Sequence, residues 1–410
     1  MATPQSVRYL NEITALNALF RSGGMSRADL ARLLGLNRST TGNIIAALIA
    51  DGLAIERPDE ARADGPARSG RPGIRIELLA DGAIFLGAEI GVDRLAVAAV
   101  DIAAQPMRCD VIRFHTARQT PEAVSDLIVG MIAGVVSSLP DAGRVRGLCL
   151  ALPALVRDGR LVNAPMLGWH HHVPIDDLVA ERLARQLPGL PIAVEVENDA
   201  NAFAIAETYR DAAEPSRTVA ALLIESGAGG GIVIGGRLFR GATGLAGAFG
   251  HLTVAGEGTA AGRLRGGPLE SQIGKEALLA RYRASGATAT AGLPDFLAAL
   301  AAGEAAAIRT ASEWGRSLAI GLVQITSVLN PDLIVLGGAL APVFRAVSDE
   351  VEAAMRLGLP EGFTQPRVAL SSLGPEAAAI GGALIVHQHM FSIDERAIHQ
   401  SAQPVSLFRA

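Results

Sequence analysis

An acidic and an amide side chain follow an apolar run at Glu197-Asn198-Asp199, and this pairing suits a ligand rich in hydroxyl groups. The carboxylate of Asp199 can accept a hydrogen bond from a hydroxyl, or take its proton as a general base. We predict that both side chains lie where a strand over 192–196 gives way to a helix over 200–209. An alternative stays open, because Asn198 and Asp199 are also common helix-capping residues.

A second candidate functional region, a DNA-binding motif, lies near the amino terminus. The spacing of apolar residues there predicts a helix over 6–20. Ser26 with Asp29 predicts the cap of a second helix, which Gly35 ends. Asn37 predicts the cap of a third helix. In a helix-turn-helix, the second helix of the pair enters the major groove with its amino-terminal residues leading. The residues predicted to contact DNA there are Arg38, Ser39, Thr40 and Asn43.

A strand over 53–55 and a return strand over 74–78 flank a loop rich in arginine, proline and glycine. This order predicts a winged helix. Arg68 and Arg71 lie in or next to the loop, where an arginine can enter an A·T-rich minor groove. The alternative is a three-helix bundle that binds another protein.

The charge distribution is compatible with nucleic-acid contact by the amino-terminal part alone. Residues 1–77 carry ten arginines and eight acidic residues, whereas the whole chain has a formal net charge of −5. Two cysteines, Cys109 and Cys149, cannot build a disulfide framework. Because no signal-peptide core or long apolar run is present, we expect a cytoplasmic protein that does not enter a membrane.

After residue 80 the chain mixes apolar strands with helices, which predicts the α/β class. The length of 410 residues predicts more than one domain. The helices are expected over 121–139, 200–209 and much of 269–358. The strands are expected over 84–88, 95–100, 145–152, 192–196, 219–224, 231–234 and 333–336.

Several motifs, in order along essentially the whole chain, resemble those of the ROK family of repressors and sugar kinases. The stretch 197–201 with Glu207 resembles its sugar-site signature, and 163–169 resembles its sugar-contacting loop. The glycine-rich turn at 227–231 is similar to its phosphate turn. Two later motifs, at 241–251 and 330–338, resemble the family's next signature and the stretch lining its adenosine site.

The resemblance implies a winged helix-turn-helix over 1–80 and a sugar-kinase-type body over 81–410. That body would have the two-lobed, actin-like ATPase (ribonuclease H-like) fold. Its small lobe would span about 81–200 plus a carboxy-terminal segment, and its large lobe about 201–385. In the kinases, the residue matching Asp199 is the general base. The residues that would contact a sugar on the cleft floor are Asn163, Asn198, Asp199, His251 and Glu270.

The chain departs from the kinase pattern where phosphate would approach. The first phosphate loop of the kinases reads Asp-aliphatic-Gly-Gly-Thr, whereas residues 89–93 read Glu-Ile-Gly-Val-Asp. The turn that usually begins Gly-Thr-Gly begins Glu225-Ser226-Gly227. Both changes place carboxylates near phosphate, which opposes ATP binding. A further departure is Ala248, which replaces a glutamate that binds two sugar hydroxyls.

The family's structural zinc site is also altered. Ala261, Arg263 and Pro268 stand at its three cysteine positions, so we expect no metal. The run His170-His171-His172 has the composition of a metal cluster. Adjacent residues on a loop point apart, however, so we interpret it as a solvated loop near the cleft.

We therefore expect a sugar-responsive transcriptional regulator, a repressor without cofactor or kinase activity. A homodimer or homotetramer would bind a pseudo-palindromic operator. The effector would be a small sugar or sugar phosphate. Two alternatives remain, an active sugar kinase with a DNA-binding head and a regulator whose pocket is vestigial.

Overall fold

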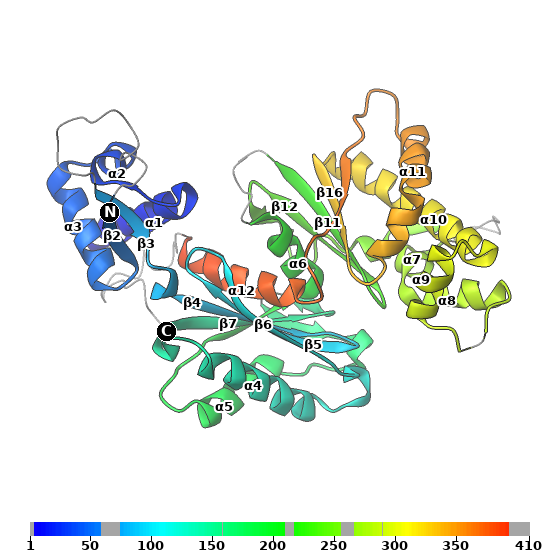
Figure 1. Ribbon diagram of the computed structural model, residues 1–410, viewed down its shortest axis with the longest axis horizontal. Coiled ribbons are helices and arrows are strands. Elements are labelled where there is room, and N and C mark those ends of the chain that lie inside the picture. Colours follow the sequence, from blue (N-terminus) through cyan, green and yellow to red (C-terminus); the bar gives the residue numbers. More distant parts are fainter. Residues whose placement is uncertain are drawn as a thin grey trace.

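The computed structural model describes residues 4–58, 74–157, 159–209, 217–255, 266–288 and 290–392. The chain forms a small head, and a body in which two lobes each contain a β-sheet (Figure 1). The wing loop, with Arg68 and Arg71, lies outside the described residues, as do Ala261 and Arg263. The predicted domain boundaries remain predictions.

The head contains α1 (Pro4–Ser22), α2 (Arg27–Leu34) and α3 (Arg38–Ala50). Strands β1 (Met25–Ser26) and β2 (Ala54–Pro58) pair antiparallel with β3 (Ile74–Leu78). The predicted helix caps are confirmed. The hydroxyl of Ser26 accepts a hydrogen bond from the amide of Asp29, and Asn37 accepts one from the amide of Thr40. Gly35 ends α2 with φ +64°, a left-handed conformation that favours glycine.

The first sheet of the body has the order β10-β7-β4-β5-β6. Strands β5 and β6 are antiparallel to their neighbours, whereas β7 and β10 run parallel to β4. Helices α4 (Pro121–Ser137) and α5 (Ile175–Gln186) share a core with one face, and α12 (Ala377–Met390) packs on the other. The strands are β4 (Ile84–Ile90), β5 (Arg94–Asp101), β6 (Pro106–Arg113), β7 (Val145–Leu152) and β10 (Val194–Asn198).

The second sheet, β17-β16-β11-β12-β13, repeats this order and these strand directions. Two sheets of one topology are typical of the actin-like fold, so the expected α/β class and architecture are confirmed. The strands are β11 (Thr218–Ile224), β12 (Ala228–Ile234), β13 (Arg237–Leu238), β16 (Leu333–Gly337) and β17 (Arg367–Leu370).

Helices cover both faces of the second sheet. Helix α6 (Asp199–Thr208) lies on the face that turns toward the first lobe, against β11 and β12. The other face carries α7 (Glu270–Ile273), α8 (Lys275–Ala284), α9 (Leu293–Ala301), α10 (Ala305–Leu329) and α11 (Ala341–Gly358). Two short hairpins complete the body, β8 (Leu155–Arg157) with β9 (Arg160–Asn163), and β14 (Thr253–Ala255) with β15 (Gly266–Pro268).

Helices α6 and α12 pack against each other between the two sheets, and glycine brings their backbones into contact. A Cβ atom at Gly381 in α12 would overlap the carbonyl oxygen of Ala202 in α6. Helix α12 approaches the first sheet equally closely, because a Cβ atom at Gly87 in β4 would overlap the carbonyl oxygen of Ala379. The glycines that permit this packing also lower helix propensity, which is why the sequence pattern did not predict α12. Strands β6 and β17 were missed because they are sheet edges, where burial is incomplete.

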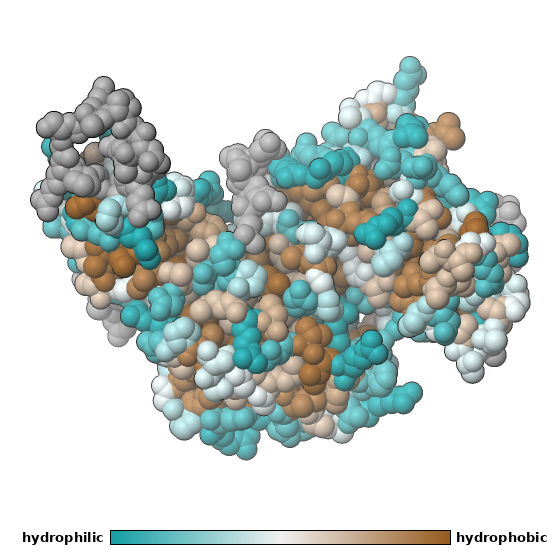
Figure 2. Space-filling model, in the orientation of Figure 1, coloured by the Kyte–Doolittle hydropathy of each residue, from teal (hydrophilic) through white to brown (hydrophobic). Residues whose placement is uncertain are grey.

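On the face shown in Figure 2, hydrophilic and hydrophobic residues are interspersed. Within the described ranges, no helix combines the length and apolarity that crossing a bilayer requires.

We predict that Gly381→Ala lowers the free energy of unfolding by about 1–3 kcal/mol, because the added methyl group forces α6 and α12 apart. Urea unfolding measures this change. Gly130→Ala in α4 is the matched control, since a Cβ there meets nothing within 4 Å. It should stabilise the helix by up to about 1 kcal/mol. Equal losses in the two variants would contradict the packing role of Gly381.

Candidate functional site

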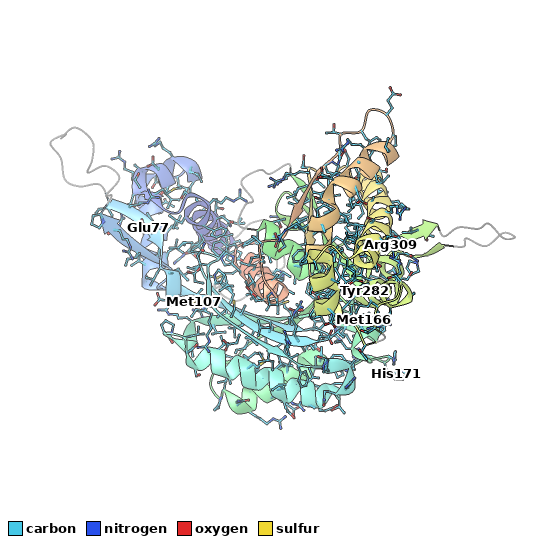
Figure 3. The ribbon with its side chains drawn as sticks, turned by 45° about the vertical axis from the view of Figure 1, so that its right-hand side comes forward. Glu77, Met107, Met166, His171, Tyr282 and Arg309 are labelled. Carbon is cyan, nitrogen blue, oxygen red and sulfur yellow. The ribbon has the colours of Figure 1, made fainter. Side chains whose placement is uncertain are left out.

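A cavity of about 320 Å³ lies between the two lobes, within the size range of small-molecule sites. Its floor is formed where β10 ends and α6 begins. Met166 of the small lobe, labelled in Figure 3, also lines it. The side chain of Met166 approaches Gly227 of the large lobe. The structure brings together all five residues predicted from the sugar-site motifs, which are Asn163, Asn198, Asp199, His251 and Glu270.

Asn198 both caps α6 and lines the cavity. Its Oδ1 accepts hydrogen bonds from the amides of Ala200 at 3.0 Å and Asn201 at 3.1 Å. Its Nδ2 donates to the carbonyl oxygen of Ala154 at 3.0 Å. The helix-capping alternative is therefore correct for the side-chain oxygen. One amide hydrogen of Nδ2 remains for a ligand.

Asp199, in the first turn of α6, carries a carboxyl group whose pKa is raised to about 6. Burial is the main cause, and the negative charge of Glu225 adds to it, while a hydrogen bond from the amide of Ala200 opposes it. Above this pH the carboxylate can accept a hydrogen bond from a ligand hydroxyl. The same pKa would suit a general base, so the value alone does not separate binding from catalysis.

Asn163, His251 and Glu270 complete the polar lining. Nδ1 of His251 lies 3.9 Å from Oε1 of Glu270, and the histidine side chain is mostly exposed. Oδ1 of Asn163 is buried and has no hydrogen-bond partner among the described residues. Because a buried acceptor without a partner is costly, a ligand hydroxyl at Asn163 would relieve this cost.

Ion pairs cross the cleft where the two stretches that resemble phosphate loops, 89–93 and 225–231, face each other. Arg94 of the small lobe lies 2.8 Å from Oε1 of Glu89 and 3.1 Å from Oε1 of Glu225, at the end of β11. The same oxygen of Glu225 accepts a hydrogen bond from the amide of Ala339 at 3.2 Å. Burial raises the pKa of Glu89 to about 7, although Arg94 opposes the shift. The two lobes thus meet through Arg94.

A second pair crosses the cleft beside the first, between Nζ of Lys275 in α8 and Asp93. His115 also contacts Asp93, with 3.1 Å between Nδ1 and Oδ1. Sequence reasoning gave no role to Arg94 or Lys275. The available signal was a charged residue at the start of a largely apolar strand, but the partner of Arg94 across the cleft, Glu225, lies 131 positions away.

The candidate DNA-binding residues gather at the beginning of α3. Arg38, Ser39 and Asn43 are exposed, and Thr40 is partly buried with its amide bonded to the capping Asn37. Arg38 has no acidic partner among the described residues. By contrast, Arg27 pairs with Glu56 and Arg32 pairs with Asp29. Within the described part of the chain, the front of α3 therefore presents Arg38 without an acidic partner, together with short polar side chains.

The histidine run 170–172 is exposed and does not line the cavity, and Figure 3 shows His171 at the periphery of the small lobe. No group of three or more histidine, cysteine or acidic residues in the described ranges is arranged to hold a metal ion. Of the three former cysteine positions, only Pro268 in β15 lies within those ranges.

Asp199→Asn is expected to stabilise the protein at neutral pH. An aspartate ionises near pH 3.8 when unfolded and Asp199 near pH 6 when folded. The native state therefore retains a proton that the unfolded state loses, so stability falls as pH rises from about 4 to about 6. Removing this titration should raise the free energy of unfolding above pH 6 by about 2–3 kcal/mol.

Urea unfolding of both proteins between pH 4 and pH 8 measures the effect. Asp349→Asn, at an exposed position of α11, is the control and should change little at any pH. A stability difference between wild type and Asp199→Asn that does not vary with pH would contradict the assigned pKa.

Residues 85–389 match the model of the ROK family. The chain is 24% identical over 394 residues to the xylose repressor of Bacillus spizizenii, covering 94% of this chain and 97% of that protein. Its fold is similar to a ROK family transcriptional regulator, a homologue of the E. coli MLC protein, with a TM-score of 0.74 at 21% identity over 94% of this chain and 97% of that one.

A ROK family glucokinase from Streptomyces griseus, solved with glucose and AMPPNP, aligns with a TM-score of 0.64 at 25% identity. That alignment covers 75% of this chain and all of the kinase. The family match spans most of the sequence and includes both lobes around the cavity. The chain belongs to the ROK family.

Proposed function

We propose that this protein is a sugar-responsive repressor of carbohydrate genes, which binds an effector in the cleft and does not phosphorylate it. The likeness to the xylose repressor supports the function because it extends over 94% of the chain, head included. We infer the absence of kinase activity from the ion pairs that Arg94 and Lys275 form across the cleft.

The charges in the cleft oppose ATP. Five carboxyl groups line the cavity, on Glu89, Asp93, Asp199, Glu225 and Glu270, and among the described residues Arg94 and Lys275 are the arginine and lysine that pair with them. Because its pKa is about 7, Glu89 is only partly ionised at neutral pH. Two unit charges 4 Å apart interact by roughly 4 kcal/mol at an effective dielectric of 20, so a triphosphate entering this region meets substantial repulsion. Glu225 already holds the guanidinium of Arg94 and the amide of Ala339, two donors of the kind that bind phosphate.

The same charges favour an uncharged sugar over a sugar phosphate. Arg94 directs Nε and both terminal nitrogens to carboxylates, and Lys275 is paired with Asp93. A phosphate group beside Asp199 would therefore find no free cation in the described part of the cavity. Hydroxyl groups can bond to its carboxylates and amides, while Leu155 and Met166 offer an apolar surface to the ring carbons.

In this proposal the head binds a pseudo-palindromic operator as part of a homodimer or homotetramer, with α3 in the major groove. Sugar binding changes the spacing or orientation of the heads, by an amount set by its differential affinity for the two states.

A coupled assay of ATP hydrolysis tests the absence of kinase activity. With D-xylose, D-glucose and N-acetylglucosamine as acceptors, we expect no sugar-dependent turnover, because the phosphate region is occupied by Glu225 and its partners. The S. griseus glucokinase is the positive control. Turnover that requires sugar and disappears in Asp199→Asn would establish the rival function, a kinase with a DNA-binding head.

Arg38→Ala is expected to weaken operator binding by roughly 10-fold, as for one lost phosphate contact. The slope of the logarithm of the binding constant against the logarithm of salt concentration should become shallower by about one. Arg309→Ala, in α10 of the large lobe, is the matched control (Figure 3). Fluorescence anisotropy with labelled operator DNA at several salt concentrations measures both quantities. An Arg38→Ala variant with wild-type affinity and salt dependence would refute the placement of α3 on DNA.

A further inference from the structure

One helix connects the ligand cavity with the DNA-binding head. Helix α6 begins at Asp199, which lines the cavity, and is followed by Tyr209, a buried residue at its carboxyl end. Its ten residues span about 15 Å. Most of its side chains are buried, and it packs on β11, β12 and α12. A helix held in this way moves as a unit, so a displacement at one end reaches the other.

At the carboxyl end of α6, the hydroxyl of Tyr209 lies 2.9 Å from Nδ1 of His387 in α12. Nε2 of His387 lies 2.9 Å from the carbonyl oxygen of Ile102. Because a carbonyl only accepts, Nε2 carries the proton and Nδ1 accepts the hydrogen bond from Tyr209. Burial lowers the pKa of His387 to about 4, so the imidazole is neutral. These two hydrogen bonds define one orientation of the ring.

The first helix of the head packs directly on this pair. The ring of Phe20 in α1 lies 5.7 Å from that of Tyr209 and 5.0 Å from that of His387, measured between centroids. Phe391 closes the aromatic cluster at 5.3 Å from Phe20. The side chain of Asn17 donates a hydrogen bond to the carbonyl oxygen of Phe391 at 2.7 Å. The head is thus attached where α6 and α12 end.

A second contact joins the head to the body. Arg144, next to the start of β7, donates a hydrogen bond to the carbonyl oxygen of Asp51 at 3.0 Å and lies against Gly52. The aromatic cluster of Phe20, Tyr209, His387 and Phe391 differs from it in lying at the end of the helix whose first turn contributes Asp199 to the cavity.

We propose that Tyr209 and His387 are positioning residues that transmit occupancy of the cavity to the head. A ligand that forms hydrogen bonds with Asn198 and Asp199 displaces the first turn of α6. The displacement shifts Tyr209 against His387 and Phe20, and α1 changes its orientation on the body. This inference rests on the proposed function, because it concerns the regulation of the same site.

Tyr209→Phe tests the connection, since it removes the hydroxyl and keeps the ring against Phe20. The coupling factor is the ratio of operator Kd values with and without saturating sugar, D-xylose or D-glucose. It should fall by about 2- to 10-fold, as for one buried hydrogen bond. The sugar Kd from calorimetry should stay within about twofold.

Tyr282→Phe is the matched control. Its hydroxyl donates a hydrogen bond to Glu304 at 3.2 Å, and Figure 3 shows Tyr282 in the large lobe, far from the head that carries Glu77. The control should keep the wild-type coupling factor. Wild-type coupling in Tyr209→Phe, or an equal loss in both variants, would overturn the proposal.

Hydrogen exchange of the α1 amides over residues 13–22 gives a readout that does not depend on DNA. Bound sugar should change this exchange in wild type and in Tyr282→Phe, and should change it less in Tyr209→Phe. If bound sugar changes the exchange of α1 but not the operator affinity, the proposed function is wrong, whereas transmission from α6 to α1 is supported. If bound sugar changes the exchange of α1 equally in wild type and in Tyr209→Phe, transmission through Tyr209 is refuted, whatever the effect on DNA binding.

Asn198→Ala tests the same transmission without sugar, because it removes the cap of α6 at the cavity end. The exchange of α1 should change in this single variant and return toward the wild-type rate when Tyr209→Phe is added. Unchanged exchange of α1 in Asn198→Ala would also contradict the connection.

Discussion

The ion pair between Arg94 and Glu225 is the interaction on which this account of the molecule depends. It joins the lobes at two segments, 89–94 and 225–227, that lie at or beside the stretches resembling the phosphate loops of the family's kinases. Glu225 supplies the negative charge, and Arg94 with the amide of Ala339 supplies the donors. In the proposed function these groups take the place of the nucleotide's phosphates, so that the lobes meet without a nucleotide. The proposed cleft binds sugar and does not transfer phosphate.

Helix α6 serves both parts of the molecule. Its first turn contributes Asp199 to the cavity, and its carboxyl end lies beside the head. The resemblance implies that, in the kinases, the residue matching Asp199 in this helix is the general base. Here the same rigid element also lies on the route from ligand to DNA, which explains how a catalytic fold can become a sensor without a new domain between the cavity and the head. The close packing of α6 and α12 at Gly381 keeps this route stiff.

Local features were predicted well from the sequence. Caps such as Ser26 and Asn37 depend on a few neighbouring residues, and the structure confirms both. The cavity residues Asp199 and His251 were found because they lie in motifs with fixed spacing. Helix α12 was missed, because Gly381 and Gly382 are poor helix formers whose value lies in packing against distant segments.

Pairing between distant charges could not be predicted in the same way. Asp93 and Glu225 were recognised as carboxylates that oppose phosphate, but their partners Lys275 and Arg94 depend on how the two lobes meet. The same holds for Tyr209 and His387, which are 178 positions apart and show no local pattern. Spacing along a chain reports neighbours on one element, whereas these contacts arise from the tertiary arrangement.

Calorimetric titration of AMPPNP with magnesium tests whether Glu225 and Arg94 exclude a nucleotide, because it measures nucleotide binding without requiring catalysis. The titration would be run on the free protein and on protein saturated with D-xylose or D-glucose, whichever binds. We predict no binding in either case at nucleotide concentrations up to about 1 mM. A micromolar Kd that strengthens in the presence of the sugar would contradict it, since a nucleotide would then displace Glu225 and restore the phosphate site.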